Sequence, residues 1–235
     1  MPFSPPKRTT RPPRRRDAVA TRQRLMASGR RAFARKGLAG AILTDDILRP
    51  ANVSIGSFYH QFRDKNELLV AILDDHARTF RARLLRTLDR PSDAGDASFV
   101  DIVRACFGLA LDMADDDGDL LCIQRRERDS DDPVVAEYLR ENHQSWIERV
   151  ANYFHRGAAD DVSSADCRLA AQFVIHLALT SVALYQDLPE NERPEARNRL
   201  LDAMVRFTMG GLPALTRERR SPADSYEPDQ EKAIE

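Results

Sequence analysis

Apolar residues recur along most of this chain with the three- and four-residue spacing of amphipathic helices. The pattern predicts helices over residues 17–36, 44–50, 64–88, 97–114, 119–129, 133–156, 164–187 and 194–209. The segments between them are rich in turn and capping residues, and "GGLP" at 210–213 is expected to end the last helix. No stretch alternates polar and apolar residues for long enough to predict a sheet, so the predicted fold class is all-α.

The first predicted helix carries its apolar face on Leu25, Gly29, Ala32 and Phe33. A glycine inside a helix lowers its stability by about 1 kcal/mol relative to alanine. We therefore expect a second helix to cross close to Gly29. Gly37 is expected to end this first helix.

Residues 44–62 predict two short helices joined by a tight turn. "TDDILRP" (44–50) forms the first helix, "ANVS" (51–54) the turn and "IGSFYHQF" (55–62) the second helix. A helix-turn-helix has this arrangement, and its second helix enters the major groove of DNA. Asn52 suits the turn because asparagine tolerates the left-handed backbone conformation.

The two faces of the second short helix differ in chemistry. Val53, Phe58 and Phe62 are spaced to face a three-helix core. The outward positions hold hydroxyl, imidazole and aliphatic groups that can reach phosphates and base edges: Ile55, Ser57, Tyr59 and His60.

Charge is distributed unevenly, although the net charge is only -1. Residues 1–65 hold 15 Lys or Arg against 4 Asp or Glu, whereas the remaining residues hold 21 against 33. A basic N-terminal part of this kind is typical of a protein that meets a polyanion. Residues 1–16 contain five prolines and six cations and predict a disordered arm that either follows a phosphate backbone or is an inert tail. Residues 214–235 predict a disordered tail.

Several functional classes lack their sequence signatures. The three cysteines, Cys106, Cys122 and Cys167, form no CxxC pair, and no HExxH, GxSxG or GxGxxG motif is present. The chain has no run of roughly 18 continuous apolar residues and no apolar secretory signal. These features predict a soluble cytoplasmic protein that is not an enzyme and holds no metal or cofactor.

Two stretches carry a family resemblance. "RLMASGRRAFARKG" (24–37) followed by "DILRPANVSIGSFYHQFRDKNELL" (46–69) resembles the DNA-binding domain of the TetR family, over about residues 22–73. The resemblance implies a helix-turn-helix domain at 17–64 and a larger helical ligand-binding and dimerisation domain at 65–213. It also implies a homodimeric repressor that a small apolar effector releases from a palindromic operator. The alternative is a constitutive or structural DNA-binding protein without an effector.

The same resemblance assigns DNA-binding roles by position. Thr44, Tyr59 and Lys65 match phosphate contacts, and the positions of Ser54, Ser57 and His60 match those that read bases or phosphates. Ile55 either reads a thymine methyl group or packs within the protein. The chain departs from the family pattern at Asn52, where glycine is usual, and at Ile55, where a cation is common. It also has Pro50 at the end of the supporting helix and one additional residue between Gly37 and Ile47.

The remaining helices predict an assembly surface and a ligand site. "LAAQFVIHLALTSVALY" (169–185) is apolar almost all the way round, so a second copy of the chain is expected to cover one side of it. Large apolar groups mixed with isolated polar groups are typical of small-molecule sites and of ordinary cores alike. The candidate ligand-binding residues are Phe107, Met113, Arg125, Trp146, Phe154, Phe173, His176 and Thr180.

Overall fold

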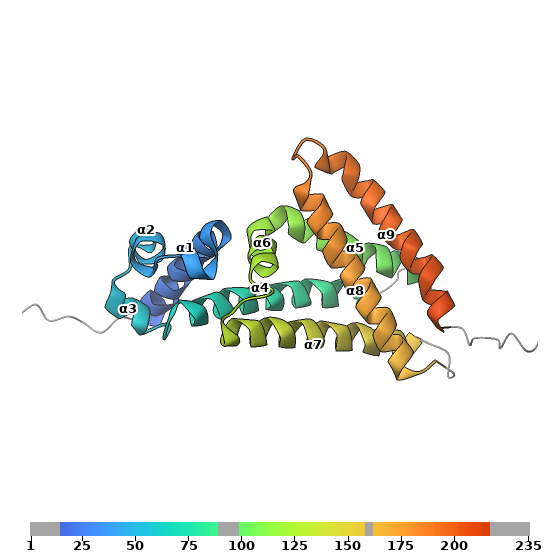
Figure 1. Ribbon diagram of the computed structural model, residues 1–235, viewed down its shortest axis with the longest axis horizontal. Helices are drawn as coiled ribbons and strands as arrows, with labels where there is room; N and C mark the ends of the chain where they lie inside the picture. Colours follow the sequence, from blue (N-terminus) through green and yellow to red (C-terminus); the bar gives the residue numbers. More distant parts are fainter. Residues whose placement is uncertain (1–14, 89–98, 158–161, 217–235) are drawn as a thin grey trace, which may run out of the picture. The chain divides into compact units, whose positions relative to one another are not determined.

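The computed structural model describes residues 15–88, 99–157 and 162–216 (Figure 1). Their helices are, in order, α1 (Arg15–Gly40), the π-helical turn η1 (Leu43–Leu48), α2 (Arg49–Ala51), α3 (Ile55–Tyr59), α4 (Lys65–Leu88), α5 (Phe99–Asp116), α6 (Gly118–Arg126), α7 (Pro133–Gly157), α8 (Ser164–Asp187) and α9 (Arg193–Thr216). No strand occurs in these three ranges, which confirms the all-α prediction. The predicted arm and tail lie almost wholly outside the described residues.

The described residues form two compact units. The first takes its residues from Met1–Arg90 and Asp112–Asn142, and the second from Pro91–Leu111 and His143–Glu235. The first unit therefore holds α1 to α4, the end of α5, α6 and the beginning of α7. The second holds most of α5, the rest of α7, α8 and α9. The domain boundary predicted at residue 65 remains a prediction.

The core of the first unit forms where α1 crosses α4. Leu25, Ala32 and Phe33 are fully buried, as are Leu68 and Leu69 on α4. A Cβ added at Gly29 would lie 2.9 Å from Leu68 Cδ2 and 3.1 Å from Ile72 Cδ1. The close crossing predicted from this glycine is confirmed.

The end of α1 is fixed by the end of α6. Gly37 breaks the helical backbone with a φ of 71°, and this confirms that the regular helix stops there. Beyond the break, the Leu38 N–H donates to Glu127 Oε1 at 2.8 Å, while Arg126 Nη1 donates to the Ala34 carbonyl at 3.2 Å. A glycine is needed at this position because a side chain would strain the backbone and approach Arg126 Cδ to 3.0 Å.

The supporting helix of the predicted helix-turn-helix begins as a π-helix, η1, and ends as α2. A π-helical turn holds one residue more than an α-helical turn. This wider turn lies within the stretch where the sequence has an additional residue relative to the family pattern. Pro50 is the second residue of α2 and, because it has no N–H, donates no hydrogen bond back to the preceding turn.

The second unit is built on the pair α8 and α9, which pack side by side (Figure 1). Arg104 of α5 forms an ion pair with Asp202 of α9 at 2.6 Å, and Arg168 of α8 donates to Gln144 of α7 at 2.9 Å. The helix α8 is long and apolar enough to cross a membrane, a property shared by core helices of soluble proteins. It keeps apolar side chains exposed: Leu169, Phe173, Leu179 and Leu184.

The predicted end of the last helix is wrong. The helix α9 does not end at "GGLP" but continues to Thr216. Gly37 is the only glycine with a positive φ among the described residues, so Gly210 and Gly211 keep a right-handed backbone. Glycine ends a helix only where the chain adopts the left-handed conformation, and here it does not.

Candidate nucleic-acid interface

The short helix α3 is held by its cap and by buried rings. Ser54 Oγ accepts a hydrogen bond from the Ser57 N–H at 3.2 Å, and the two hydroxyl oxygens lie 2.9 Å apart. Phe58 is fully buried, with its ring centre 5.8 Å from that of Phe62. A helix of five residues has no stability of its own, so these contacts decide its orientation.

The turn before α3 has the conformation that the sequence predicts. Asn52 has a φ of 51° and a ψ of 51°, and it is the only non-glycine residue with a positive φ in the described ranges. Its N–H donates to the Arg49 carbonyl at 3.1 Å, and its own carbonyl accepts from Arg24 Nη1 of α1 at 3.5 Å. The left-handed residue therefore turns the chain from α2 into α3 within three residues.

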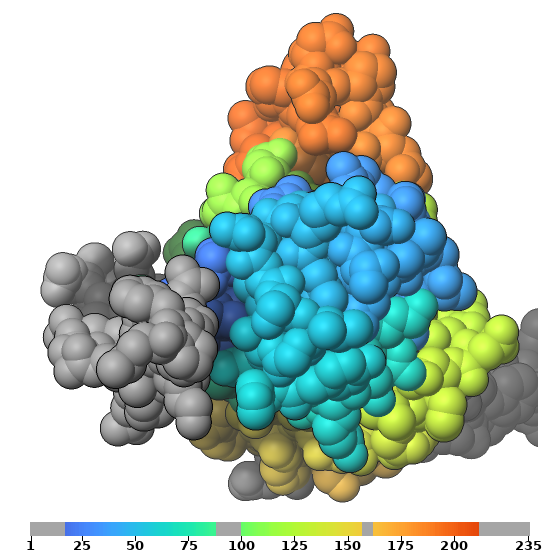
Figure 2. Space-filling model, turned by 90° about the vertical axis from the view of Figure 1, so that its left-hand side faces the viewer, coloured from blue at the N-terminus to red at the C-terminus, as the bar shows by residue number. Residues whose placement is uncertain are grey.

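The outward face of α3 presents two large side chains. Ile55 is 51% exposed and Tyr59 is 57% exposed. The Tyr59 ring packs edge-on against Phe58 at 5.3 Å between centres, which restricts its motion. Thr44, Ser54 and His60 are exposed as well, and Ser57 is half-buried. Figure 2 looks onto this side of the first unit, where the blue and cyan segments form one continuous surface.

A glycine lies in the middle of this face, and the sequence analysis missed its significance. A Cβ added at Gly56 would meet no other atom within 4 Å. Neither backbone conformation nor packing within the described chain requires glycine here, unlike at Gly37 and Gly29. The signal available in the sequence was the glycine itself, placed in a five-residue helix that it weakens.

Lys65, which the resemblance assigns to a phosphate, has partners within the chain. Its Nζ donates to the carbonyls of Leu38 at 2.6 Å, Ala41 at 3.2 Å and Ala39 at 3.4 Å. These carbonyls lie at and just after the end of α1, so the ammonium joins that end to the start of α4. To contact a phosphate, the Lys65 ammonium would have to give up some of these hydrogen bonds to carbonyl groups.

Replacing Lys65 by methionine tests this arrangement. Hydrogen bonds to a charged group contribute about 1.5 to 3 kcal/mol, so the free energy of unfolding should fall by roughly that amount. Urea denaturation measures it, with Lys36→Met as the control because Lys36 is the more exposed cation and pairs with Asp46 at the surface. Equal, small losses in both variants would contradict a structural role for Lys65.

Arginines of α1 and of the flanking turns also lie around the helix-turn-helix, and the sequence showed them only as net charge. Arg22 stacks on the Phe62 ring, 4.4 Å from its centre, and donates to the Gln61 carbonyl at 3.3 Å. Arg49 and Arg63 have highly exposed side chains, although each also pairs with an acidic residue four positions away. Finding these cations requires knowing which face of α1 meets the turn.

The eight candidate ligand-binding residues are not gathered in one compact unit. Met113 and Arg125 belong to the first unit, and the other six belong to the second. Phe107 and Met113 are buried, while Phe154 packs against a small cluster of Ile147, Ala151 and Ala171. Trp146 is half-buried, and the remaining four are exposed: Arg125, Phe173, His176 and Thr180. Their role in binding a ligand remains a prediction.

Sequence comparisons relate part of this chain to known regulatory proteins. The model described as "Bacterial regulatory proteins, tetR family" matches residues 25–72, from α1 to the middle of α4. The HTH-type transcriptional repressor NemR of Escherichia coli K12 is 32% identical over 93 residues, which are 40% of this chain and 44% of that protein. The helix-turn-helix domain of this chain is a TetR-family domain. The aligned region spans less than half of the NemR sequence.

Solved structures extend the likeness in fold to most of the chain. A TetR-family regulator from Streptomyces coelicolor superposes with a TM-score of 0.63 at 19% identity, covering 85% of this chain and 97% of the other. The reduced form of Escherichia coli NemR superposes with a TM-score of 0.58 at 20% identity, covering 81% and 95%. At these identities the comparison concerns the fold alone.

Proposed function

We propose that this TetR-family protein is a DNA-binding transcriptional repressor that a small apolar effector releases from a palindromic operator. The observation that carries the proposal is the geometry of α3. Its buried Phe58 fixes the helix, while Ile55 and Tyr59 project outward beside exposed hydroxyl and imidazole groups. The N-terminal excess of Lys and Arg supports a polyanionic partner.

Each outward group has a proposed role on DNA. Thr44 and Tyr59 contact backbone phosphates, and Lys65 adds positive charge beside them. Ser54, Ser57 and His60 contact phosphates or base edges, whereas Ile55 packs on a thymine methyl group.

The exposed apolar side chains of α8 and α9 support a homodimer. Phe173, Leu184 and Phe207 are more than half exposed, which is unusual for large apolar groups on a pair of adjacent helices. A second copy related by a two-fold axis would cover the same residues on both chains. Two recognition helices then read two half-sites about one helical turn, or 34 Å, apart.

The proposed effector is mostly apolar because the candidate residues are aromatic or sulfur-containing, with Arg125, His176 or Thr180 to orient a polar end. It would act by favouring a form of the dimer whose recognition helices no longer match the half-sites. The proposed location is the cytoplasm, where the DNA of a bacterial cell lies.

Selection from a pool of random DNA duplexes tests the DNA-binding proposal. The expected product is a two-fold symmetric sequence, bound at least a thousandfold more tightly than random DNA. Equal binding to all sequences would instead favour a constitutive or structural DNA-binding protein.

A thermal-shift screen of apolar compounds, followed by a measurement of operator release, tests whether the protein has an effector. Compounds that raise the melting temperature without changing operator affinity would contradict release.

Replacing Gly56 by alanine separates DNA affinity from stability. Because its Cβ points into open space, the substitution should leave the free energy of unfolding unchanged or raise it by up to about 1 kcal/mol. If DNA approaches α3 closely at this point, the added methyl group should weaken operator binding severalfold. Fluorescence anisotropy with the selected duplex measures this effect, and unchanged affinity would contradict a close approach at Gly56.

A further inference from the structure

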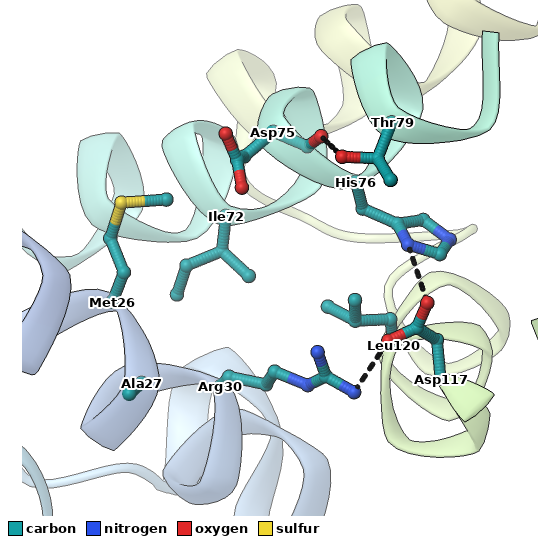
Figure 3. Close-up of a pocket in the computed structure, with 9 residues that line it drawn as sticks. All are labelled: Met26, Ala27, Arg30, Ile72, Asp75, His76, Thr79, Asp117 and Leu120. Atoms are coloured by element: carbon teal, nitrogen blue, oxygen red, sulfur yellow. Dashed lines mark hydrogen bonds and ion pairs between the residues drawn. The ribbon is translucent and has the colours of Figure 1, made fainter. Parts of the chain in front are cut away.

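A cavity of about 260 Å³ lies within the first unit, between α1, α4 and α6 (Figure 3). One part of the wall is apolar and comes from Met26, Ala27, Ile72 and Leu120. The other part is polar and comes from Arg30, Asp75, His76, Thr79 and Asp117.

Asp117 directs its carboxylate toward the cavity rather than toward its own helix. It occupies the N-cap position of α6, yet its side chain makes no capping hydrogen bond. Oδ1 lies 3.0 Å from Arg30 Nη2, and the same guanidinium also makes a two-point contact with Asp119. Oδ2 accepts no hydrogen bond from any described residue, and it lies 3.8 Å from His76 Nδ1.

His76 is the second group without a hydrogen-bond partner. It is only 7% exposed, and neither ring nitrogen bonds to another residue in the described ranges. Burial lowers its pKa below the ordinary value of 6.5. Asp117 and Asp119 oppose this shift, whereas Arg30 and Arg83 add to it. The imidazole is therefore mostly neutral at pH 7 and offers one nitrogen lone pair.

We propose that this cavity binds a small primary amine in its ammonium form, held by Asp117 and His76. Two of the ammonium N–H groups would donate to Asp117 Oδ2 and to the free imidazole nitrogen. A nitrogen about 2.8 Å from both acceptors fits between atoms that are 3.8 Å apart. The short alkyl group would pack on Met26, Ile72 and Leu120.

The local charges favour a cation over an anion. Two carboxylates, Asp75 and Asp117, line the cavity, and a third, Asp119, pairs with Arg30 of its wall. Arg30 is already engaged by two of them, and Asp75 pairs with Arg78 at 3.2 Å on the outer side. An anionic ligand would have to face Asp117 Oδ2 without a free cation beside it, which is unfavourable at this distance.

The site uses none of the candidate effector residues and does not depend on DNA binding. Titration calorimetry of the full-length protein with n-butylammonium chloride, at constant ionic strength, therefore tests it directly. Saturable binding is expected, at least tenfold tighter than that of n-butanol or sodium pentanoate, which carry the same butyl chain. Equal heats from all three compounds would overturn the proposal and identify non-specific binding.

Three variants assign the binding to the cavity. Asp117→Asn should weaken it at least tenfold, whereas Asp101→Asn, an exposed residue of α5 in the second unit, should leave it unchanged. Because Asp117→Asn also disturbs the contact with Arg30, Ala27→Leu provides a second test. Ala27 is an exposed residue of the wall, so leucine should narrow the cavity without breaking an ion pair or the helix. Wild-type affinity in a folded Ala27→Leu variant would overturn the proposal.

Discussion

Glutamate in place of Phe207 is expected to convert the protein into monomers and to lower operator affinity at least a hundredfold. Phe207 is 68% exposed on α9, beside α8 with its own exposed Leu169, Phe173 and Leu184. Burying one phenylalanine in the interface would stabilise the dimer by about 1.5 to 3 kcal/mol. Because of the two-fold symmetry, each substitution removes this contribution from both chains. A carboxylate in such a contact adds a desolvation cost of several kcal/mol.

Sedimentation velocity and anisotropy with the selected duplex measure the two effects. Phe207→Leu is the matched control, because it keeps an apolar side chain and should remain dimeric. A Phe207→Glu protein that stays dimeric would contradict an interface on α9. A monomeric variant that binds the operator as tightly as the wild type would contradict the need for a dimer.

The two faces of α3 should respond to alanine in opposite ways. Phe58→Ala removes a fully buried ring and should lower the free energy of unfolding by about 3 to 5 kcal/mol. Ile55→Ala removes an exposed side chain three residues earlier and should change stability by less than about 0.5 kcal/mol. Its expected effect is on DNA: about fivefold weaker operator binding, equivalent to about 1 kcal/mol.

Urea denaturation gives the free energy of unfolding of each variant, and operator titration gives its DNA affinity. Comparing the two quantities separates a role in packing from a role in DNA recognition. The comparison is controlled internally, because both residues belong to the same five-residue helix. A destabilised Ile55→Ala variant would place this side chain in the core. A stable Ile55→Ala variant with unchanged operator affinity would remove it from the proposed DNA contacts.

Local backbone features were predictable where a residue type occurs at a position for one dominant physical reason. Asn52 takes the left-handed conformation because few other residues tolerate it, and Gly37 breaks α1 for the same reason. Gly29 indicated a helix crossing because glycine lowers the stability of a helix, so its presence there needs a reason in packing. The prediction that the last helix ends at "GGLP" was wrong because glycine and proline allow a helix to end without requiring it. The helix α9 continues through these residues.

The sequence by itself therefore determined the helical periods, the helix-turn-helix and the inward position of Phe58. These depend on the spacing of residues along one helix and on local backbone preferences. Only the tertiary structure decided which partner each polar group meets. It joined Lys65 to the end of α1, and it brought Arg30 of α1, His76 of α4 and Asp117, at the N-cap position of α6, around one cavity. Residue spacing specifies the side of a helix on which a group lies, but the packing of other helices decides what faces that side.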